Sequence, residues 1–414
     1  MCGCRQVIEE DRNRLFERFR LSGYQKVMIV TTRFGPYPPD VTILRGGIDT
    51  NTQNLIDILG GNGFDVTVAA LDYVRKSGVD DRPEVRRIGT YRPYAFEKSP
   101  HRKLLRLLNA ETLNPVVLTR LLVLLRTQRP DAIILQESLQ LGLAPHIAAR
   151  ILRVPLYFRN DWICPARPED IACGFKKRVF ECSVCLAAKM GQRLGKLEGY
   201  GLGLFSALIY LLKSWFWRTG AGAIPSSEYV ADLLVGYGVP RSRILVVRPC
   251  REIEIYTVSD EPFVRLQYDG VPKLLFVGRL EKDKGIDVLL DSFKQALAGG
   301  TCAELLIAGE GTLRPLVEES ASECARVVYL GWLDEDGLSQ AYQVCDAVIM
   351  PTIVIESHGI VAEEAISYGK ILAGSNKGGL ARIMAEYPKS IAIDEVNVDS
   401  LARVIIELAE RSGT

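Results

Sequence analysis

Two glutamates near the C-terminal end of the chain are spaced so that both could act on one ligand. Glu356 and Glu364 stand eight positions apart in the stretch PTIVIESHGIVAEEAISYGK, residues 351–370. The apolar run before them, Asp346–Met350, predicts a buried parallel strand, and the pattern after Gly359 predicts a helix. Glu356 would then lie in the loop and Glu364 on the helix. An ordinary strand–helix unit with solvated glutamates fits this pattern about equally well.

The predicted start of this helix could also bind a phosphate. Gly359 lacks a side chain, so the backbone there can approach a ligand closely. The N–H groups of Gly359, Ile360 and Val361 would lack intrahelical acceptors, and the helix dipole favours an anion at this end. One strand–loop–helix unit would thus offer a phosphate-binding site with a carboxylate on either side.

Three further loops follow apolar runs in the same half of the chain. Arg279 and Lys284 lie in FVGRLEKDKG, Glu310 lies in AGEG, and a glycine pair lies in NKGGL. Ligands of open α/β folds bind at the carboxyl ends of the strands, where these loops would gather. The sequence therefore predicts one binding site made from four loops.

This half of the chain resembles the nucleotide-sugar domain of family 4 retaining glycosyltransferases (glycosyl transferases group 1). Glu356, Glu364 and Ala365 match the family's marker of two glutamates separated by seven residues and followed by alanine. The Gly-Arg-Leu…Lys-Gly segment, residues 278–285, matches a second marker. Either marker alone is weak, but the two in this order and roughly eighty residues apart are specific.

The resemblance implies a GT-B fold of the α/β class, in which two Rossmann-like domains with doubly wound parallel sheets face a central cleft. The alternation of predicted strands and helices with short loops agrees with this. The parts that we expect are an extension helix, an acceptor-binding domain, a linker and a nucleotide-sugar-binding domain, over residues 1–25, 26–248, 249–272 and 273–414. Relatives continue into a helix that crosses back to the first domain. We expect that helix to be missing here, or replaced by the N-terminal helix or a partner chain.

The resemblance also implies a reaction, the hexosyltransferase-type transfer of a sugar from a nucleoside diphosphate to a hydroxyl acceptor with retention. Arg279 and Lys284 would neutralise the leaving diphosphate, where charge develops in the transition state. Glu364 would accept hydrogen bonds from the ribose, and Glu356 would bind sugar hydroxyls and stabilise the cationic sugar. Front-side attack needs no protein nucleophile, and the family needs no cofactor. The acidic triplet 334–336 is therefore interpreted as a helix N-terminus and not as a metal site.

The first half supplies fewer site residues. Gly46 and Gly47 match the family's glycine loop near the donor diphosphate or the acceptor, although an ordinary turn explains them as well. Asn160 and Asp161 match a His-Asp motif in which histidine contacts the donor sugar. Asparagine can form hydrogen bonds but cannot titrate, so this departure affects any step that needs a base. Arg382 is a second departure, since relatives often have glutamate there.

Four cysteines follow that motif with the spacing C-x8-C-x8-C-x2-C: Cys164, Cys173, Cys182 and Cys185. Four thiolates could close a tetrahedral zinc site, and such a site would be structural because no coordination position stays open. Buried free thiols are the other interpretation.

Two basic, apolar segments could lie on an anionic membrane surface. Residues 101–129 carry six Arg or Lys against one acid, and residues 202–218 form the most apolar predicted helix. In that helix Trp215 stands beside Lys213 and Arg218, which suits a headgroup layer. Core-facing helices with a solvated basic face explain both segments as well.

Composition sets the remaining limits. The 414 residues are enough for two or three domains, and the net charge of +1 predicts no nucleic-acid partner. The charged start has no signal peptide and the ten cysteines lack a disulfide pattern, so we expect the cytoplasm, with peripheral binding at the inner face of the membrane as an option. No apolar run is long enough to span a bilayer.

Two other functions are open. A non-catalytic partner of another transferase would bind nucleotide only, and Asn160 favours it while Lys284 and Glu356 do not. A nucleotide-sugar epimerase on the same fold would need acid and base groups, and the chain has only three histidines. The base, sugar and acceptor are not identified, and the acceptor could be a saccharide, a lipid-linked saccharide or a small molecule. The resemblance implies cell-surface polysaccharide or glycolipid synthesis.

Overall fold

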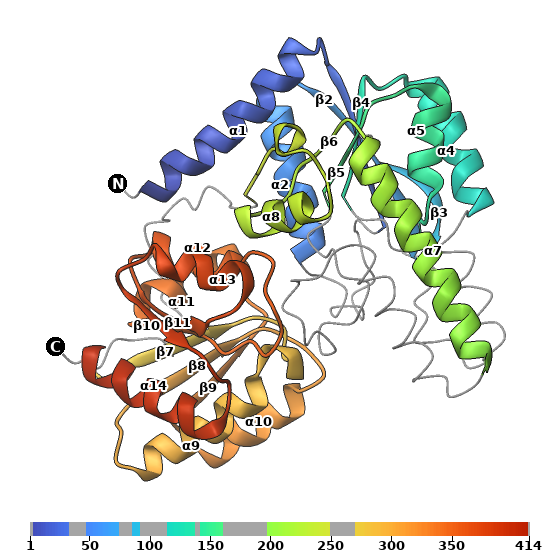
Figure 1. The fold of residues 1–414 in the computed structure, drawn as a ribbon. Coiled ribbons are helices and arrows are strands. Elements are labelled where there is room, and N and C mark those ends of the chain that lie inside the picture. The colour runs from blue at the N-terminus through green and yellow to red at the C-terminus, as the bar shows by residue number, and fades with distance from the viewer. Residues whose placement is uncertain are drawn as a thin grey trace. The chain divides into compact units, whose positions relative to one another are not determined.

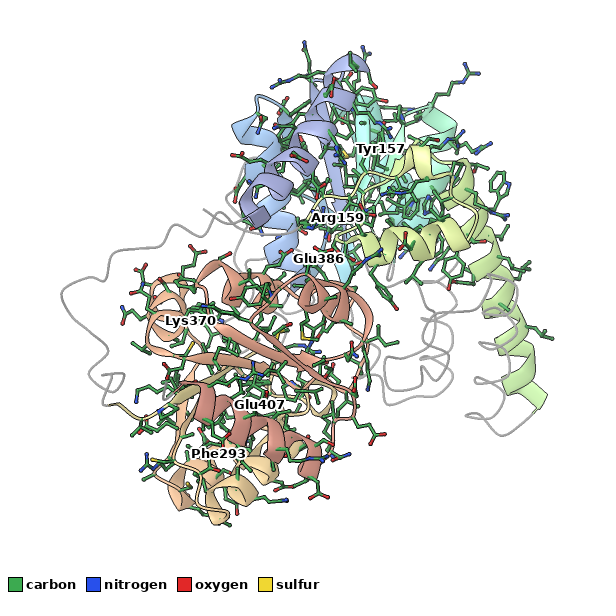
Figure 2. All side chains as sticks on the ribbon, turned by 60° about the vertical axis from the view of Figure 1, so that its left-hand side comes forward. Tyr157, Arg159, Phe293, Lys370, Glu386 and Glu407 are labelled. Carbon is green, nitrogen blue, oxygen red and sulfur yellow. The ribbon has the colours of Figure 1, made fainter. Side chains whose placement is uncertain are left out.

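The computed structural model describes residues 3–32, 47–73, 85–91, 114–136, 141–159, 197–248 and 270–412. The chain divides into two compact units (Figure 1). The first comprises Arg5–Ala166 and Phe175–Pro249, and the second is built on Cys250–Thr414. Tyr157 and Phe293, both buried, lie inside the first and the second unit respectively (Figure 2).

The described strands of the first unit form one six-stranded parallel sheet in the order β3-β2-β1-β4-β5-β6. They are β1 (Lys26–Thr31), β2 (Asp65–Tyr73), β3 (Val85–Tyr91), β4 (Ala132–Leu135), β5 (Leu156–Phe158) and β6 (Gly222–Ala223). The order reverses between β1 and β4, which makes the sheet doubly wound. The apolar run at residues 244–247 suggests a further strand, but Ile244 forms only an isolated bridge to Ala223.

Helices cover both faces of this sheet. They are α1 (Gly3–Leu21), α2 (Gly47–Gly61), α4 (Pro115–Gln128), α5 (Ala144–Leu152), α7 (Leu197–Thr219) and α8 (Glu228–Gly236), with a 3-10 turn η4 (Arg241–Arg243). Side chains of β1 alternate between the faces: Val27 and Ile29 pack with α1 and α2, whereas Met28 and Val30 pack with α4, α5, α7 and α8.

The N-terminal helix α1 is part of this core. Leu15 and Phe19 are fully buried, and the ring of Phe19 lies 5.1 Å from that of Tyr157 on β5. Asp11 pairs with Arg248 Nη1 at 2.6 Å. Burial raises the pKa of Asp11 from 3.8 to about 6, against the lowering effect of Arg248. The predicted N-terminal amphipathic helix is therefore confirmed, and it packs as an integral layer of the first unit.

The second unit repeats the same topology, with its described strands in the order β12-β11-β10-β7-β8-β9. They are β7 (Lys273–Val277), β8 (Glu304–Ala308), β9 (Val327–Gly331), β10 (Ala347–Met350), β11 (Ile371–Ser375) and β12 (Ser390–Ile393). All pairs are parallel, and the order reverses between β7 and β10. These two strands are the apolar runs that the sequence predicted as buried.

Its helices also form two layers. One layer contains α9 (Ile286–Ala298), α10 (Arg314–Glu323) and α14 (Val398–Ser412), and the other contains α11 (Glu335–Val344), α12 (Ile360–Ser367) and α13 (Gly378–Ala385). A 3-10 turn, η5 (Lys282–Lys284), follows β7. Among the helices described in either unit, none has the length and apolar character to cross a membrane.

Candidate active site

Lys284 and Glu356 meet at the carboxyl ends of the two central strands of the second sheet. Lys284 follows β7 through η5, and Glu356 lies in the loop that follows β10. Lys284 Nζ contacts Glu356 Oε1, and the two side chains are 24% and 18% exposed. The sheet order reverses between these strands, and open α/β sheets bind ligands at such a switch point. The structure thus brings together two residues that the sequence identified separately.

Glycine allows the two loops to interlock. Gly285 has a φ of +71°, and a Cβ there would lie 2.1 Å from the carbonyl oxygen of Pro351. Asp283 O accepts hydrogen bonds from Ile353 N at 2.9 Å and Thr352 Oγ1 at 3.2 Å. Any side chain at position 285 would push these loops apart, so Gly285 positions the Lys284–Glu356 pair.

Arg279 lies in the same loop as Lys284. Its Nη2 donates to Asp283 Oδ2 at 2.7 Å, and half of the arginine side chain is exposed. A guanidinium group has five N–H donors, so this pair leaves others for an anion. Arg279 therefore stands beside the pair as a second cation.

The loop after β8 packs directly on the loop after β7. A Cβ on Gly309, whose φ is +142°, would lie 1.8 Å from Gly278 O. Leu280 N donates to Glu310 O at 2.9 Å. The Glu310 carboxylate pairs with Arg314 Nη1 at 3.1 Å. The backbone of Glu310, and not its side chain, therefore connects this loop to the loop after β7.

Helix α12 begins beside Glu356 without a side-chain cap. The first backbone hydrogen bonds to its start are donated by Ala362 and Glu363 to Gly359 O, at 3.0 and 3.2 Å. The N–H groups of Gly359, Ile360 and Val361 precede these bonds, and such groups bind anions at helix N-termini. They lie at the helix end where the sequence predicted a phosphate, and the binding of a phosphate there stays a prediction.

The glycine pair Gly378-Gly379 fixes the Glu356 loop from another side. Gly379 N donates to Glu356 O at 2.7 Å, and a Cβ at position 379 would lie 2.4 Å from Ser357 O. The start of α13 therefore holds the backbone of Glu356 in place. Arg382 lies one turn further along this helix.

Glu364 has a partner that the sequence did not identify. Tyr342, buried on α11, donates from its hydroxyl to Glu364 Oε2 at 2.7 Å. Burial and the adjacent carboxylate raise the pKa of Tyr342 well above its usual value. Tyr368 stacks on the same ring at 5.2 Å between centroids. No spacing rule links residues on separate helices, so the sequence carried no signal for this contact.

His358 is buried at the edge of the same loop. Its Nε2 lies 2.9 Å from Glu363 Oε2, and both side chains are less than a tenth exposed. Neither imidazole nitrogen makes a well-directed hydrogen bond to another described residue. A packing role for His358 agrees with this burial.

The other predicted site residues fall mainly outside the described residues. Gly46, Asn160, Asp161 and the four cysteines Cys164, Cys173, Cys182 and Cys185 lie there, and Gly47 is the first residue of α2. Within the ranges that the structure describes, no group of three or more metal-ligating side chains could hold an ion. Asp334 caps α11 by accepting from Gly337 N at 2.9 Å, as the interpretation of the acidic triplet predicted.

Comparison with known families gives two matches that follow one another along the chain. Residues 46–250 match the family described as Glycosyl transferase 4-like domain, and residues 258–413 match the family described as Glycosyl transferases group 1. Together they span most of both units, and α1 and β1 lie before the first match.

Curated relatives carry related descriptions. An uncharacterized glycosyltransferase of Methanocaldococcus jannaschii is 36% identical over 137 residues, which is 32% of this chain and 35% of the relative. A glycogen synthase of Mycobacterium tuberculosis is 28% identical over 217 residues, 51% of each chain. The matches thus span about half or less of the length of these relatives.

A solved structure matches almost the whole chain. HepE of Anabaena in complex with UDP-glucose has a TM-score of 0.61 at 16% identity, covering 94% of this chain and 92% of that chain. This likeness concerns the fold, and with the two doubly wound sheets it confirms the expected GT-B class.

Proposed function

Because the chain belongs to the glycosyl transferases group 1 family, we propose that it transfers a hexose from a nucleoside diphosphate sugar to a hydroxyl acceptor, with retention. The observation that carries the proposal is the Lys284–Glu356 pair at the switch point of the second sheet, beside the uncapped start of α12. In this proposal the cation, the carboxylate and the backbone N–H groups at the start of α12 would contact the same ligand.

The leaving diphosphate would lie between Lys284, Arg279 and the N–H groups of Gly359, Ile360 and Val361. Negative charge grows there as the bond to the sugar breaks, so these donors stabilise the transition state more than the ground state. The interlocked loops hold them in place before the donor arrives. Positive side chains and amides thus replace a metal ion in this proposal.

The two glutamates would contact different parts of the donor. Glu356, paired with Lys284, would bind the sugar hydroxyls and face the anomeric carbon as it becomes cationic. Glu364 would accept from the ribose hydroxyls, with its carboxylate oriented by Tyr342. For Gly46, Gly47, Asn160 and Asp161, contact with the donor or the acceptor stays a prediction from the resemblance.

The nucleotide of the donor and the biosynthetic pathway are further proposals. HepE, a relative in fold, is complexed with UDP-glucose, which favours a uridine diphosphate sugar for this chain. The cytoplasmic location, the cell-surface polysaccharide or glycolipid acceptor and a structural zinc in the cysteine segment stay predictions.

A thermal-shift panel of UDP-, GDP-, ADP- and dTDP-sugars tests the donor site. A ligand at about 100 times its dissociation constant should add roughly 2.7 kcal/mol of stability. One nucleotide class should stabilise the wild type and fail on Lys284→Ala. Lys294→Ala, an exposed lysine on α9, is the matched control and should respond as wild type.

Turnover separates a transferase from a non-catalytic partner. Hydrolysis or transfer of the stabilising donor should be detectable and should be abolished in Glu356→Ala. Donor binding without any turnover in the wild type would contradict the proposed reaction and leave only nucleotide binding.

A further inference from the structure

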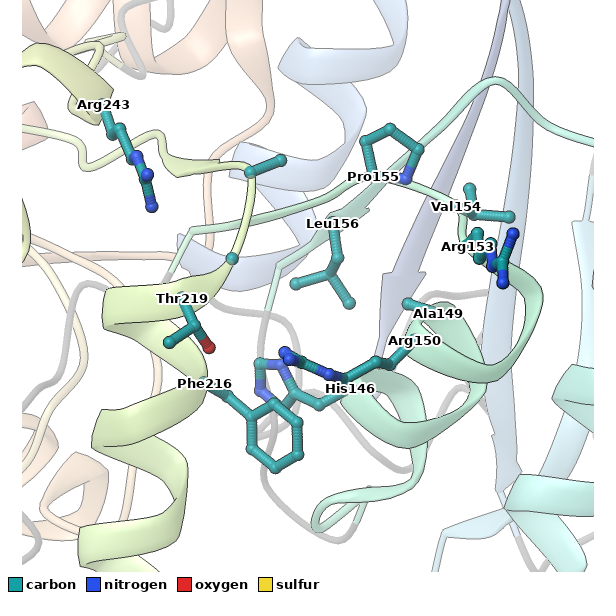
Figure 3. Close-up of a pocket in the computed structure, with 12 residues that line it drawn as sticks. His146, Ala149, Arg150, Arg153, Val154, Pro155, Leu156, Phe216, Thr219 and Arg243 are labelled. Carbon is teal, nitrogen blue, oxygen red and sulfur yellow. The ribbon is translucent and has the colours of Figure 1, made fainter.

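The first unit contains a recess at the amino ends of strands β5 and β6. Its volume is about 570 Å³, and it lies where α5 and α7 end and where β5 and β6 begin (Figure 3). Ligands of open parallel sheets bind at the carboxyl ends of the strands, so this recess is separate from the proposed transfer site. None of the residues proposed for sugar transfer lines it.

Three arginines give the recess a positive charge. Arg150, Arg153 and Arg243 line it, and no aspartate or glutamate is among the lining residues. Arg150 Cζ lies 4.8 Å above the ring of Trp215, and Arg243 Nη1 donates to Arg218 O at 3.2 Å. Among the described residues no carboxylate pairs with these three side chains. The recess therefore attracts an anion.

The ends of α5 and α7 explain part of this charge, because a helix C-terminus stabilises nearby cations. His146 adds an independent sign of a ligand. It lines the recess at 4% exposure, and its buried Nε2 has no hydrogen-bond partner among the described residues. Burial, together with Lys213, lowers its pKa to about 3, so the ring is neutral. A neutral imidazole can donate one hydrogen bond, and leaving it unmade costs stability.

Figure 3 shows how His146 is held. Its ring stacks on Phe216 of α7 with 4.9 Å between centroids, and Arg150 lies beside it. An anion beside His146 would thus meet Arg150 of α5, while Arg153, just after α5, and Arg243 of η4 line other sides of the recess. Phosphate suits this set because it accepts several hydrogen bonds from cationic donors at once.

An exposed apolar stripe leads away from the recess along α7. Leu204, Leu208, Leu212 and Trp215 are 66%, 54%, 40% and 41% exposed. Their spacing of four, four and three residues places them on one helix face. Trp215 connects the stripe to the recess, because Arg150 lies over its ring. Apolar and tryptophan side chains beside cations suit the interface of an anionic bilayer.

We propose that the first unit docks on an anionic bilayer, with a lipid phosphate in the recess and the α7 stripe in the interfacial layer. Each arginine near an anionic surface strengthens binding roughly fivefold, and the stripe adds apolar contact. This docking does not depend on sugar transfer. The recess lies at the amino ends of strands of the first sheet, whereas Lys284 and Glu356 lie at the carboxyl ends of strands of the second sheet.

Co-sedimentation of the full chain with lipid vesicles tests the proposal. The wild type should bind phosphatidylcholine vesicles only when they contain phosphatidylglycerol. Arg153→Gln with Arg243→Gln should weaken this binding roughly thirtyfold, from two lost cations. Leu208→Ser with Leu212→Ser should also weaken it, although the charge is unchanged.

Matched controls lie in the second unit. Arg403→Gln with Arg411→Gln on α14 removes the same charge, and Leu316→Ser with Ile406→Ser removes the same kind of exposed apolar side chain. Both double variants should bind vesicles as the wild type does. If they weaken binding as much as the recess and stripe variants, net charge or general hydrophobicity explains it and the proposal is overturned.

Two further measurements separate the ligand sources. His146→Phe should keep or raise thermal stability yet weaken vesicle binding, whereas a purely structural histidine would leave vesicle binding unchanged. Inorganic phosphate alone is the second probe, read by thermal shift. Stabilisation by phosphate without any vesicle binding would overturn the bilayer proposal in favour of a soluble phosphate compound. The absence of both effects would overturn the proposal of a phosphate ligand altogether.

Discussion

Lys284 and Glu356 are 72 residues apart in the sequence, and their charged groups touch at the end of the second sheet. Both side chains are mostly buried, and a buried charge without a partner costs free energy. Each side chain therefore neutralises the charge of the other. In the proposed donor site, a diphosphate would therefore share Lys284 with Glu356. The pair joins the loop after β7 to the loop after β10 in the structure without a ligand.

Removing one member of this pair should cost stability as well as donor binding. Lys284→Ala leaves a buried carboxylate without its cation, and the free energy of unfolding should fall by about 1–3 kcal/mol. Adding Glu356→Gln should restore part of that loss without restoring turnover. Urea unfolding of the two single variants and the double variant measures the coupling. Strictly additive losses would show that the pair contributes no interaction energy.

Gly285→Ala should disturb the site without touching a charged group. Its Cβ would meet Pro351 O at 2.1 Å in a left-handed backbone conformation, so we expect a loss of about 1–3 kcal/mol and weaker donor binding. Gly236→Ala on α8 is the control, because a Cβ there has nothing within 4 Å. Equal unfolding midpoints for the two variants would contradict the interlocked loops.

Tyr342→Phe tests whether the orientation of Glu364 matters for nucleotide binding. A hydrogen bond to a charged group is worth about 1.5–3 kcal/mol, so the donor should bind roughly tenfold or more weakly. Titration of the stabilising nucleotide against the variant gives the change. Tyr368→Phe removes the hydroxyl that donates to Ser339, not to Glu364, and should bind the nucleotide normally.

Asp11 should make the stability of the first unit depend on pH. Its pKa is raised to about 6, so the folded protein holds a proton that the unfolded chain has released. The stabilisation that this proton gives the folded protein is complete below about pH 4. The free energy of unfolding then falls by about 2–3 kcal/mol as the pH rises through about 6. Asp11→Asn should flatten this part of the unfolding curve, measured against Asp57→Asn, an exposed aspartate on α2. If the free energy of unfolding depended on pH in the same way in both variants, the raised pKa of Asp11 would be refuted.

The central strands of both sheets could be predicted from the sequence, because each is a nearly continuous apolar run buried on two faces. The edge strands β3 and β12 were missed. Strand β3 carries Arg86 and Arg87, and in β12 only Ile391 and Ile393 are buried, so neither is a continuous apolar run buried on two faces.

The candidate site was predicted in its residues more than in its contacts. Lys284, Glu356 and Glu364 follow from motif spacing along the chain. Their contacts depend on the adjacency of β7 to β10 and on the side of α11 that faces α12, and local pattern does not encode either. Asp283 and Tyr342 stayed unnoticed for this reason.

Helix α1 precedes in the chain the strands and helices on which it packs, and some of its partners follow much later. Phe19 packs on Tyr157, and Asp11 pairs with Arg248 across 237 residues. While the ribosome is still making the first unit, the apolar face of α1 has no complete surface to bury against. A nascent chain that ends before Tyr157 would lack one aromatic partner of Phe19, and transiently exposed apolar surface makes such chains prone to aggregate. The helix thus links the completion of the first unit to the emergence of its last segment.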